Sequence, residues 1–137
     1  MKKYFLILLS IILLSFTGCT SHKLKVSEID KWIDIGRTGT LKSYSCRDEA
    51  KINTIVNAIN NSKKAPSTIS KKISKDKTSM ADFVLTFEHK DHYLLMYDIW
   101  IDDNSYIIEE ESTGYRVIQD TDKSEFEKII NTPPNVK

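Results

Sequence analysis

Apolar residues recur along this chain with two periods, one helical and one extended, and each period predicts its own elements. The clearest helical stretch covers residues 48–61, where apolar residues at i, i+3, i+4 and i+7 mark one face of an amphipathic helix. That face consists of Ile52, Ile55, Val56 and Ile59. Asp48 is a favourable N-cap, and Pro66 prevents the helix from continuing far beyond residue 61.

A second helix is expected at residues 122–131. Asp122 stands where an N-cap residue belongs, and Glu125 follows three residues later, which is a variant of the capping box. The apolar face of this helix consists of Phe126, Ile129 and Ile130. Pro133-Pro134 then ends it, because proline cannot continue a helix.

Alternating patterns predict the strands. Within residues 81–88, one face carries Ala81, Phe83, Leu85 and Phe87. A hairpin is expected from residues 29–35 and 41–46, because Gly36 and Gly39 mark a turn between them. In its first strand the isoleucines lie on one face and Trp32 on the other. Further strands are expected at 93–101, 106–108 and 115–118. The first of these is apolar on both faces, which is typical of a central strand.

The order of these elements predicts an α+β fold. We expect a mainly antiparallel sheet of about five to six strands, with the two helices at 48–61 and 122–131 packed on it. Residues 62–79 show no apolar periodicity, since only Ile69 and Ile73 interrupt the polar residues. They are read as a long exposed loop with room for one short helical turn.

The first residues differ from the rest of the chain. Lys2 and Lys3 precede an apolar run of about a dozen residues that ends in small residues, which is the pattern of a secretory signal. A membrane-spanning helix needs about 20 apolar residues, more than this run supplies. We therefore expect a signal peptide at 1–18, a tether at 19–28 and a single α+β domain at 29–137.

Thr17-Gly18-Cys19 resembles the lipobox of bacterial lipoproteins, although Phe16 stands where leucine is commonest. The resemblance implies that Cys19 is lipidated and becomes the first residue of the mature chain. Two or more acyl tails would hold the domain stably on the extracytoplasmic face of the cell membrane. The alternative is an ordinary signal peptide cleaved near Gly18, with Cys19 free. The abundance of Ile, Lys and Asn is typical of an AT-rich Gram-positive source.

Charge is distributed unevenly. Without Lys2 and Lys3 the chain has 18 basic and 19 acidic side chains, so no basic excess points to nucleic acid. Residues 62–77 contain six lysines, which could lie against lipid or a wall polymer. The acidic stretch 98–111 could dock a basic envelope partner. Both segments are also compatible with plain solvated surface, and the oligomeric state is open.

Catalytic and metal-binding signals are weak. The chain has two cysteines, Cys19 and Cys46, too few for a disulfide framework. Cys46 could form a thiol dyad with His89 or His92, and the two histidines could bind a metal with Glu88.

The stretch 102–107 resembles a calcium loop only superficially, because Ile107 stands where the loop needs glycine. The more ordinary interpretation is a hairpin turn. The tryptophans and tyrosines are expected to lie mainly in the core. No cofactor is expected.

Four stretches resemble a family of small lipoproteins from Bacillus-like bacteria, the YhfM-like family. They are RDEAKINTIVNAINNSKKAP, MADFVLTF, YDIWID and TGYRVI. The similarity covers roughly residues 26–131, and Ala81-Asp82-Phe83 replaces a frequent Pro-Asp-Tyr. It implies an exported, lipid-anchored α+β domain and assigns no activity to any residue. The function expected from the sequence is thus a non-catalytic binding or regulatory module; the alternative is a metal-handling or thiol-dependent enzyme using Cys46 or the His89/His92 turn.

Overall fold

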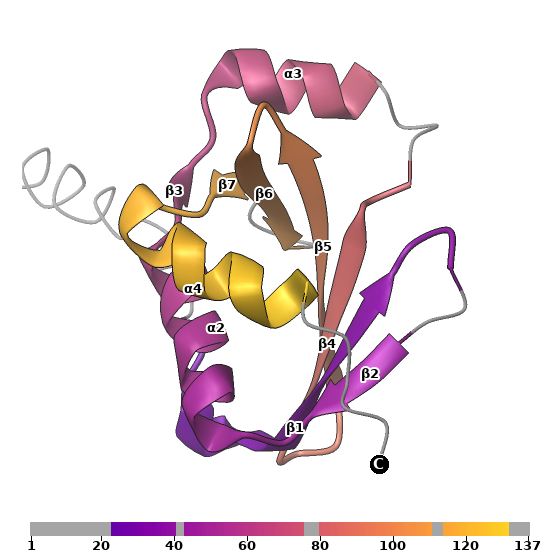
Figure 1. The fold of residues 1–137 in the computed structure, drawn as a ribbon, viewed down its shortest axis with the longest axis vertical. Helices are drawn as coiled ribbons and strands as arrows, with labels where there is room; N and C mark the ends of the chain where they lie inside the picture. Colours follow the sequence, from indigo (N-terminus) through magenta and orange to yellow (C-terminus); the bar gives the residue numbers. More distant parts are fainter. Residues whose placement is uncertain (1–22, 41–42, 76–79, 111–113, 132–137) are drawn as a thin grey trace, which may run out of the picture.

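A computed structural model describes residues 23–40, 43–75, 80–110 and 114–131, which form an antiparallel sheet with helices packed on it (Figure 1). The described elements are a 3-10 helix η1 (Val26–Glu28), β1 (Ile29–Arg37), β2 (Ser43–Cys46), α2 (Glu49–Asn61), β3 (Lys63–Lys64), α3 (Ser67–Lys75), β4 (Phe83–His89), β5 (Leu94–Asp102), β6 (Ser105–Glu110), β7 (Gly114–Val117) and α4 (Asp120–Asn131). The expected α+β class is confirmed.

The sheet has seven described strands in the order β2-β1-β4-β5-β6-β7-β3, and all neighbouring pairs are antiparallel. The expectation of about five to six strands was too low because it missed β3, which has only two residues. β5 is the fourth of the seven strands, so its predicted central position is confirmed. The hairpin predicted from residues 29–46 is also present as β1 and β2.

The helices α2 and α4 cover one face of this sheet (Figure 1). The predicted apolar faces of both helices are buried there, as are the inward residues of the strands. The side chains with almost no exposure in this core include Ile33, Ile35, Ile55, Leu85, Phe87, Ile99 and Phe126. Burial of side chains of this size stabilises the fold by about 1.5–3 kcal/mol each.

Local hydrogen bonds determine where α2 and α4 begin. The Asp48 carboxylate accepts hydrogen bonds from the backbone N–H groups of Ala50 and Lys51, at 3.0 and 3.2 Å, so the predicted N-cap is confirmed. The second helix begins at Asp120 rather than at Asp122, because the Gln119 carbonyl already accepts hydrogen bonds from the next turn. Asp122 therefore lies inside the first turn.

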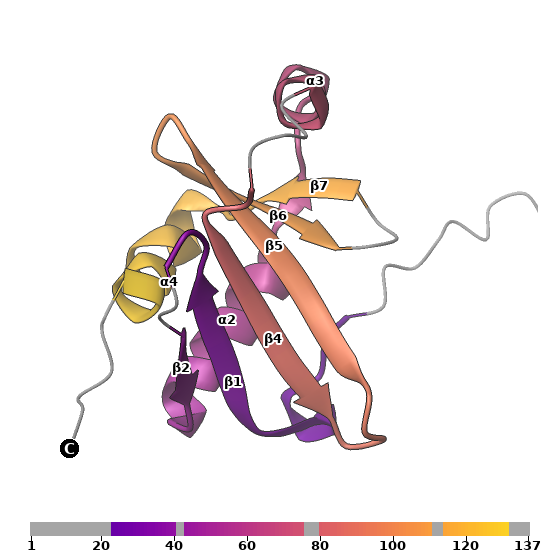
Figure 2. The ribbon, with the colours of Figure 1, turned by 90° about the vertical axis from the view of Figure 1, so that its right-hand side faces the viewer.

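The prediction of an exposed loop over residues 62–79 was wrong. Its described part contains β3 and the helix α3, so the structure has three α-helices rather than two. Ile73 is buried, and α3 lies across the β6–β7 end of the sheet, on the side opposite α2 (Figures 1 and 2). Ile107 of β6 is fully buried outside the main core. Two isoleucines in nine residues were too weak a signal to predict this helix.

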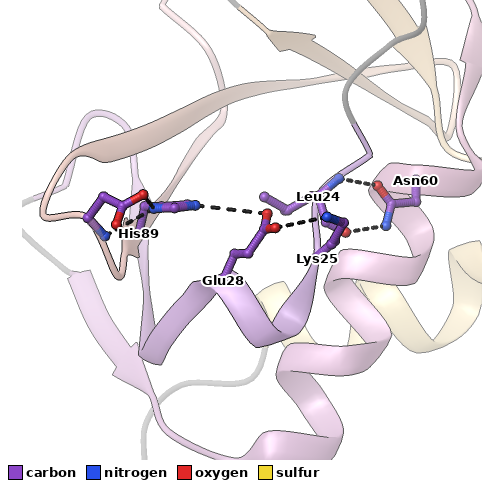
Figure 3. Close-up of polar contacts among 6 residues, drawn as sticks. Leu24, Lys25, Glu28, Asn60 and His89 are labelled. Carbon is purple, nitrogen blue, oxygen red and sulfur yellow. Dashed lines mark hydrogen bonds and ion pairs between the residues drawn. The ribbon is translucent and has the colours of Figure 1, made fainter.

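The domain also begins earlier than residue 29. Leu24 is buried, its N–H donates to Asn60 Oδ1 at 2.9 Å, and Asn60 Nδ2 donates to its carbonyl at 2.7 Å (Figure 3). The second half of the expected tether, residues 24–28, is thus packed on the domain. Residues 1–22, with the expected signal peptide and Cys19, lie outside the described residues. Within the described ranges, no helix has both the length and the apolar character needed to span a bilayer.

Candidate functional site

One face of the central sheet is covered by no helix over most of its area among the residues that the structure describes. The helices α2 and α4 occupy the inner face, whereas Figure 2 shows β1, β4 and β5 from the other side with only α3 at one end. Leu94 and Met96 of β5 remain 59% and 57% exposed. These two exposed apolar side chains are neighbours on one side of β5, and contiguous exposed apolar surface is what marks interaction sites.

Strand register identifies the residues that share this face with Leu94 and Met96. Paired residues of antiparallel strands point to the same side of a sheet. Leu94 is opposite Glu88, Met96 is opposite Thr86, and Asp98 lies between Val84 and Glu109 on its two neighbours. Thr86 is in turn opposite Asp34 of β1. We call the part of this side that surrounds Leu94 and Met96 the outer face: Asp34, Val84, Thr86, Glu88, Leu94, Met96, Asp98 and Glu109.

The outer face is acidic. Half of its residues are carboxylates and none is lysine or arginine. Asp98 and Glu109 are direct cross-strand partners, and like charges in this arrangement are destabilising. Burial raises the pKa of Asp98. Burial also raises the pKa of the neighbouring Tyr115, and the charges of Glu109 and Asp98 add to this effect. The site therefore concentrates negative potential beside an apolar strip.

Sequence reasoning missed this face because residues 93–101 looked apolar on both sides. The signal that could have revealed this face is Asp98. It is two residues from Met96 and four from Leu94, so in a strand all three side chains point to the same side. A strand covered on both faces would not carry a carboxylate there without a partner.

A second region of interest lies where η1 meets the turn between β4 and β5. It contains hollows of about 640 and 420 Å³ that share Ser27 and Lys90. The larger hollow is lined by Val26, Ile29, Asp30, Arg47, Glu49, Ile52 and Asn53 in addition to the shared pair. The smaller one is lined by Glu28, His89, Asp91 and Tyr93 in addition to that pair.

His89 is occupied by contacts with neighbouring residues of this second region. Its ring is buried and stacks on Tyr93 at a centroid distance of 4.3 Å. The Asp91 N–H donates to His89 Nδ1 at 3.1 Å, and Nε2 lies 3.9 Å from Glu28 Oε2 (Figure 3). Glu28 also accepts a hydrogen bond from Lys25 at 2.9 Å. These contacts hold the N-terminal segment against the β4–β5 turn.

The hypothesised metal site does not assemble. Neighbouring residues of a strand point to opposite faces, so His89 lies on the inner side and Glu88 on the outer face. His92 is exposed in the turn, with its Nδ1 3.7 Å from Glu88 Oε1. Across the part of the chain that the structure describes, no three His, Cys, Asp or Glu side chains come together as metal ligands.

The hypothesised thiol dyad does not assemble either. Cys46 is 7% exposed and lies opposite Ile33 of β1, while His89 belongs to β4 on the other side of β1. Two strand spacings, about 10 Å, separate β2 from β4. Burial, together with the charge of Cys46, raises the pKa of Tyr44 to about 12, and the Tyr44 hydroxyl donates to the Ile129 carbonyl. Cys46 is thus a buried member of the hydrophobic core.

The other candidates have structural roles. Asp103 and Asn104 have positive φ angles of 44° and 64°, which identifies a type I′ hairpin turn, as expected over the calcium loop. Asp102 accepts a hydrogen bond from Lys72 of α3. Among the aromatic residues, Tyr97 and Tyr106 are buried, Tyr93 is exposed, and Trp32, Trp100 and Tyr115 are half-buried.

Comparison with family models, curated proteins and solved structures found no match for this chain. The fold and the site therefore define it only as an antiparallel α+β domain with one open, acidic sheet face.

Proposed function

We propose that the mature chain is a lipid-anchored protein on the extracytoplasmic face of the cell membrane, where it acts as a non-catalytic binding or regulatory module. The observation that carries this proposal is the outer face. An exposed apolar strip flanked by carboxylates is suited to recognition of another molecule.

The anchoring part of the proposal draws on the sequence. Thr17-Gly18-Cys19 fits a lipobox, and acylation of Cys19 would supply membrane affinity. From Cys19 to Leu24 the chain can extend to at most about 17 Å. The domain would then remain close to the membrane, within reach of other envelope components. The resemblance to the YhfM-like family supports the same assignment.

Site-specific crosslinking in cells tests the binding part. The full-length chain would carry Met96→p-benzoylphenylalanine on the outer face. A matched chain would carry Asn57→p-benzoylphenylalanine, at an exposed position of α2. We expect a discrete crosslinked product in the membrane fraction from position 96 and none from position 57. Equal crosslinking from both positions, or none from position 96, would contradict a binding role for this face.

A further inference from the structure

We propose that the outer face binds a basic segment of a partner protein in extended conformation, which pairs with β5 at Leu94–Met96, where no described strand lies on the β6 side. This inference rests on the proposed binding function and specifies the chemistry of the partner. Charge, backbone geometry and side-chain packing support it separately.

Charge selects the class of partner. Asp34, Glu88, Asp98 and Glu109 make the sheet surface around Leu94 and Met96 negative, whereas Lys63 and Lys72 lie on the same side but toward α3. Such a surface repels anionic lipid headgroups and anionic wall polymers, and it attracts cations. Of the partners considered for an envelope protein, a polypeptide rich in lysine or arginine fits best.

Backbone geometry selects the conformation of the partner. The pairing of β5 with β6 ends at Tyr97 opposite Glu110, so Leu94–Met96 have no described strand on that side. The His89 N–H donates to the Tyr93 carbonyl at 2.9 Å, which directs the backbone groups of Tyr93 toward β4. Since these directions alternate along an antiparallel strand, the N–H and C=O groups of Leu94 and Met96 point to the open side. An added strand would satisfy them.

Side chains of the added strand would then alternate between the two faces of the sheet. Those on the outer side would lie beside Leu94 and Met96, and the nearest outer-face carboxylates would be Asp98 on β5 itself, Glu109 on β6 and Glu88 on the next strand, β4. A segment that alternates basic and apolar residues would place its basic side chains on the outer face and its apolar side chains on the inner face. The chain's own lysine-rich segment does not present itself this way, because Ser67–Lys75 is helical.

The direct test titrates the full mature protein with two synthetic ten-residue peptides, one alternating Lys and Val and one alternating Glu and Val. Isothermal titration calorimetry measures affinity, and amide hydrogen exchange locates the bound peptide. We expect the Lys-Val peptide to bind and to protect the amides of Leu94 and Met96. The Glu-Val peptide should not bind, and added salt should weaken the Lys-Val complex.

Matched charge variants make the test specific. Glu88→Gln combined with Asp98→Asn should weaken Lys-Val binding by about tenfold, since it removes two nearby charges. Glu49→Gln combined with Glu125→Gln removes the same charge from exposed helical positions and should leave the affinity unchanged. Circular dichroism checks that both variants are folded.

Three outcomes would overturn the inference. They are equal binding of the two peptides, an unchanged affinity in the Glu88/Asp98 variant, and concentration-dependent self-association that protects α3 and the outer face together. The last outcome would assign the face to a second copy of this chain. If Met96 crosslinks in cells while neither peptide binds, the binding function stands and only the basic partner is wrong.

Discussion

Asp98 is, at the residue scale, a charged side chain whose position in the sheet disfavours its charge. It is half-buried on a sheet and lies directly opposite another carboxylate, Glu109. Neither packing nor hairpin formation requires a carboxylate here, since Thr86 and Val84 occupy equivalent positions on β4. The loss of stability caused by these two opposed carboxylates would be explained if their charge serves recognition of a partner.

Asp98→Asn should stabilise the domain at neutral pH. Because burial raises the pKa of Asp98, the carboxylate is disfavoured in the folded chain, and stability falls as pH rises through that pKa. The variant should gain about 0.2–1 kcal/mol in free energy of unfolding at pH 7, the size of a cross-strand pair effect, and nothing at pH 3. Urea unfolding at the two pH values measures this. A gain that is equal at both values would contradict the electrostatic explanation.

Cys46 gives a second prediction at this scale. Its thiol is buried, so Ellman's reagent should react with it only as fast as the domain opens, while Ser43→Cys on the exposed end of β2 should react at once. If Cys19 carries lipid, as proposed, the mature protein in denaturant should titrate as one thiol per chain, because Cys46 is the other cysteine. Two thiols would show that Cys19 is unmodified.

At the element scale, local sequence was sufficient where a strong pattern coincided with a clear start or stop signal. α2 has a four-residue apolar face and a cap at Asp48, and both are seen in the structure. α3 has neither, and what ties it to the rest of the fold is the burial of Ile73 and the contact of Lys72 with Asp102 of β5. Local propensity is decisive only when tertiary contacts do not outweigh it.

Replacement of the α2 cap tests how much local hydrogen bonding contributes to the stability of this helix. Asp48→Ala leaves the N–H groups of Ala50 and Lys51 without their acceptor, and it should lower the free energy of unfolding by about 1 kcal/mol. Asp48→Asn retains the acceptor oxygen and should differ from the wild type by only a few tenths of a kcal/mol. Thermal or urea unfolding of the two variants gives the comparison. Equal losses would indicate that the cap hydrogen bonds are not the cause.

The N-terminal segment depends on Asn60 in a similar way. Asn60→Ala removes both hydrogen bonds to the Leu24 backbone and should destabilise the contact by about 1–3 kcal/mol. Hydrogen exchange at Leu24 should then be at least about fivefold faster. Asn57→Ala, an exposed change on the same helix, should leave this exchange unchanged. If Leu24 stays protected without Asn60, its burial alone holds the segment.

At the scale of the whole molecule, the proposed function separates two tasks. The first residues would place the chain at the membrane, and the domain would present the outer face. Cys19→Ala should therefore release the protein from the membrane or leave it unprocessed, without affecting the fold of the domain. Membrane fractionation and circular dichroism measure the two effects. Normal membrane retention at the mature size would contradict lipid anchoring through Cys19.

The sequence by itself determined the fold class, the antiparallel order of most strands, and the core faces of α2 and α4. These follow from local periodicity, capping and turn residues, which act within a few positions of the chain. It also contains the stretch that resembles a lipobox, on which the anchoring proposal depends.

Only the tertiary structure decided which face of β5 remains open, because covering a strand depends on where distant helices pack. It placed β1 between Cys46 and His89, and it placed residues 24–28 within the domain through contacts between distant positions. Burial and strand register are properties of the assembled sheet, and the candidate site exists only at that level.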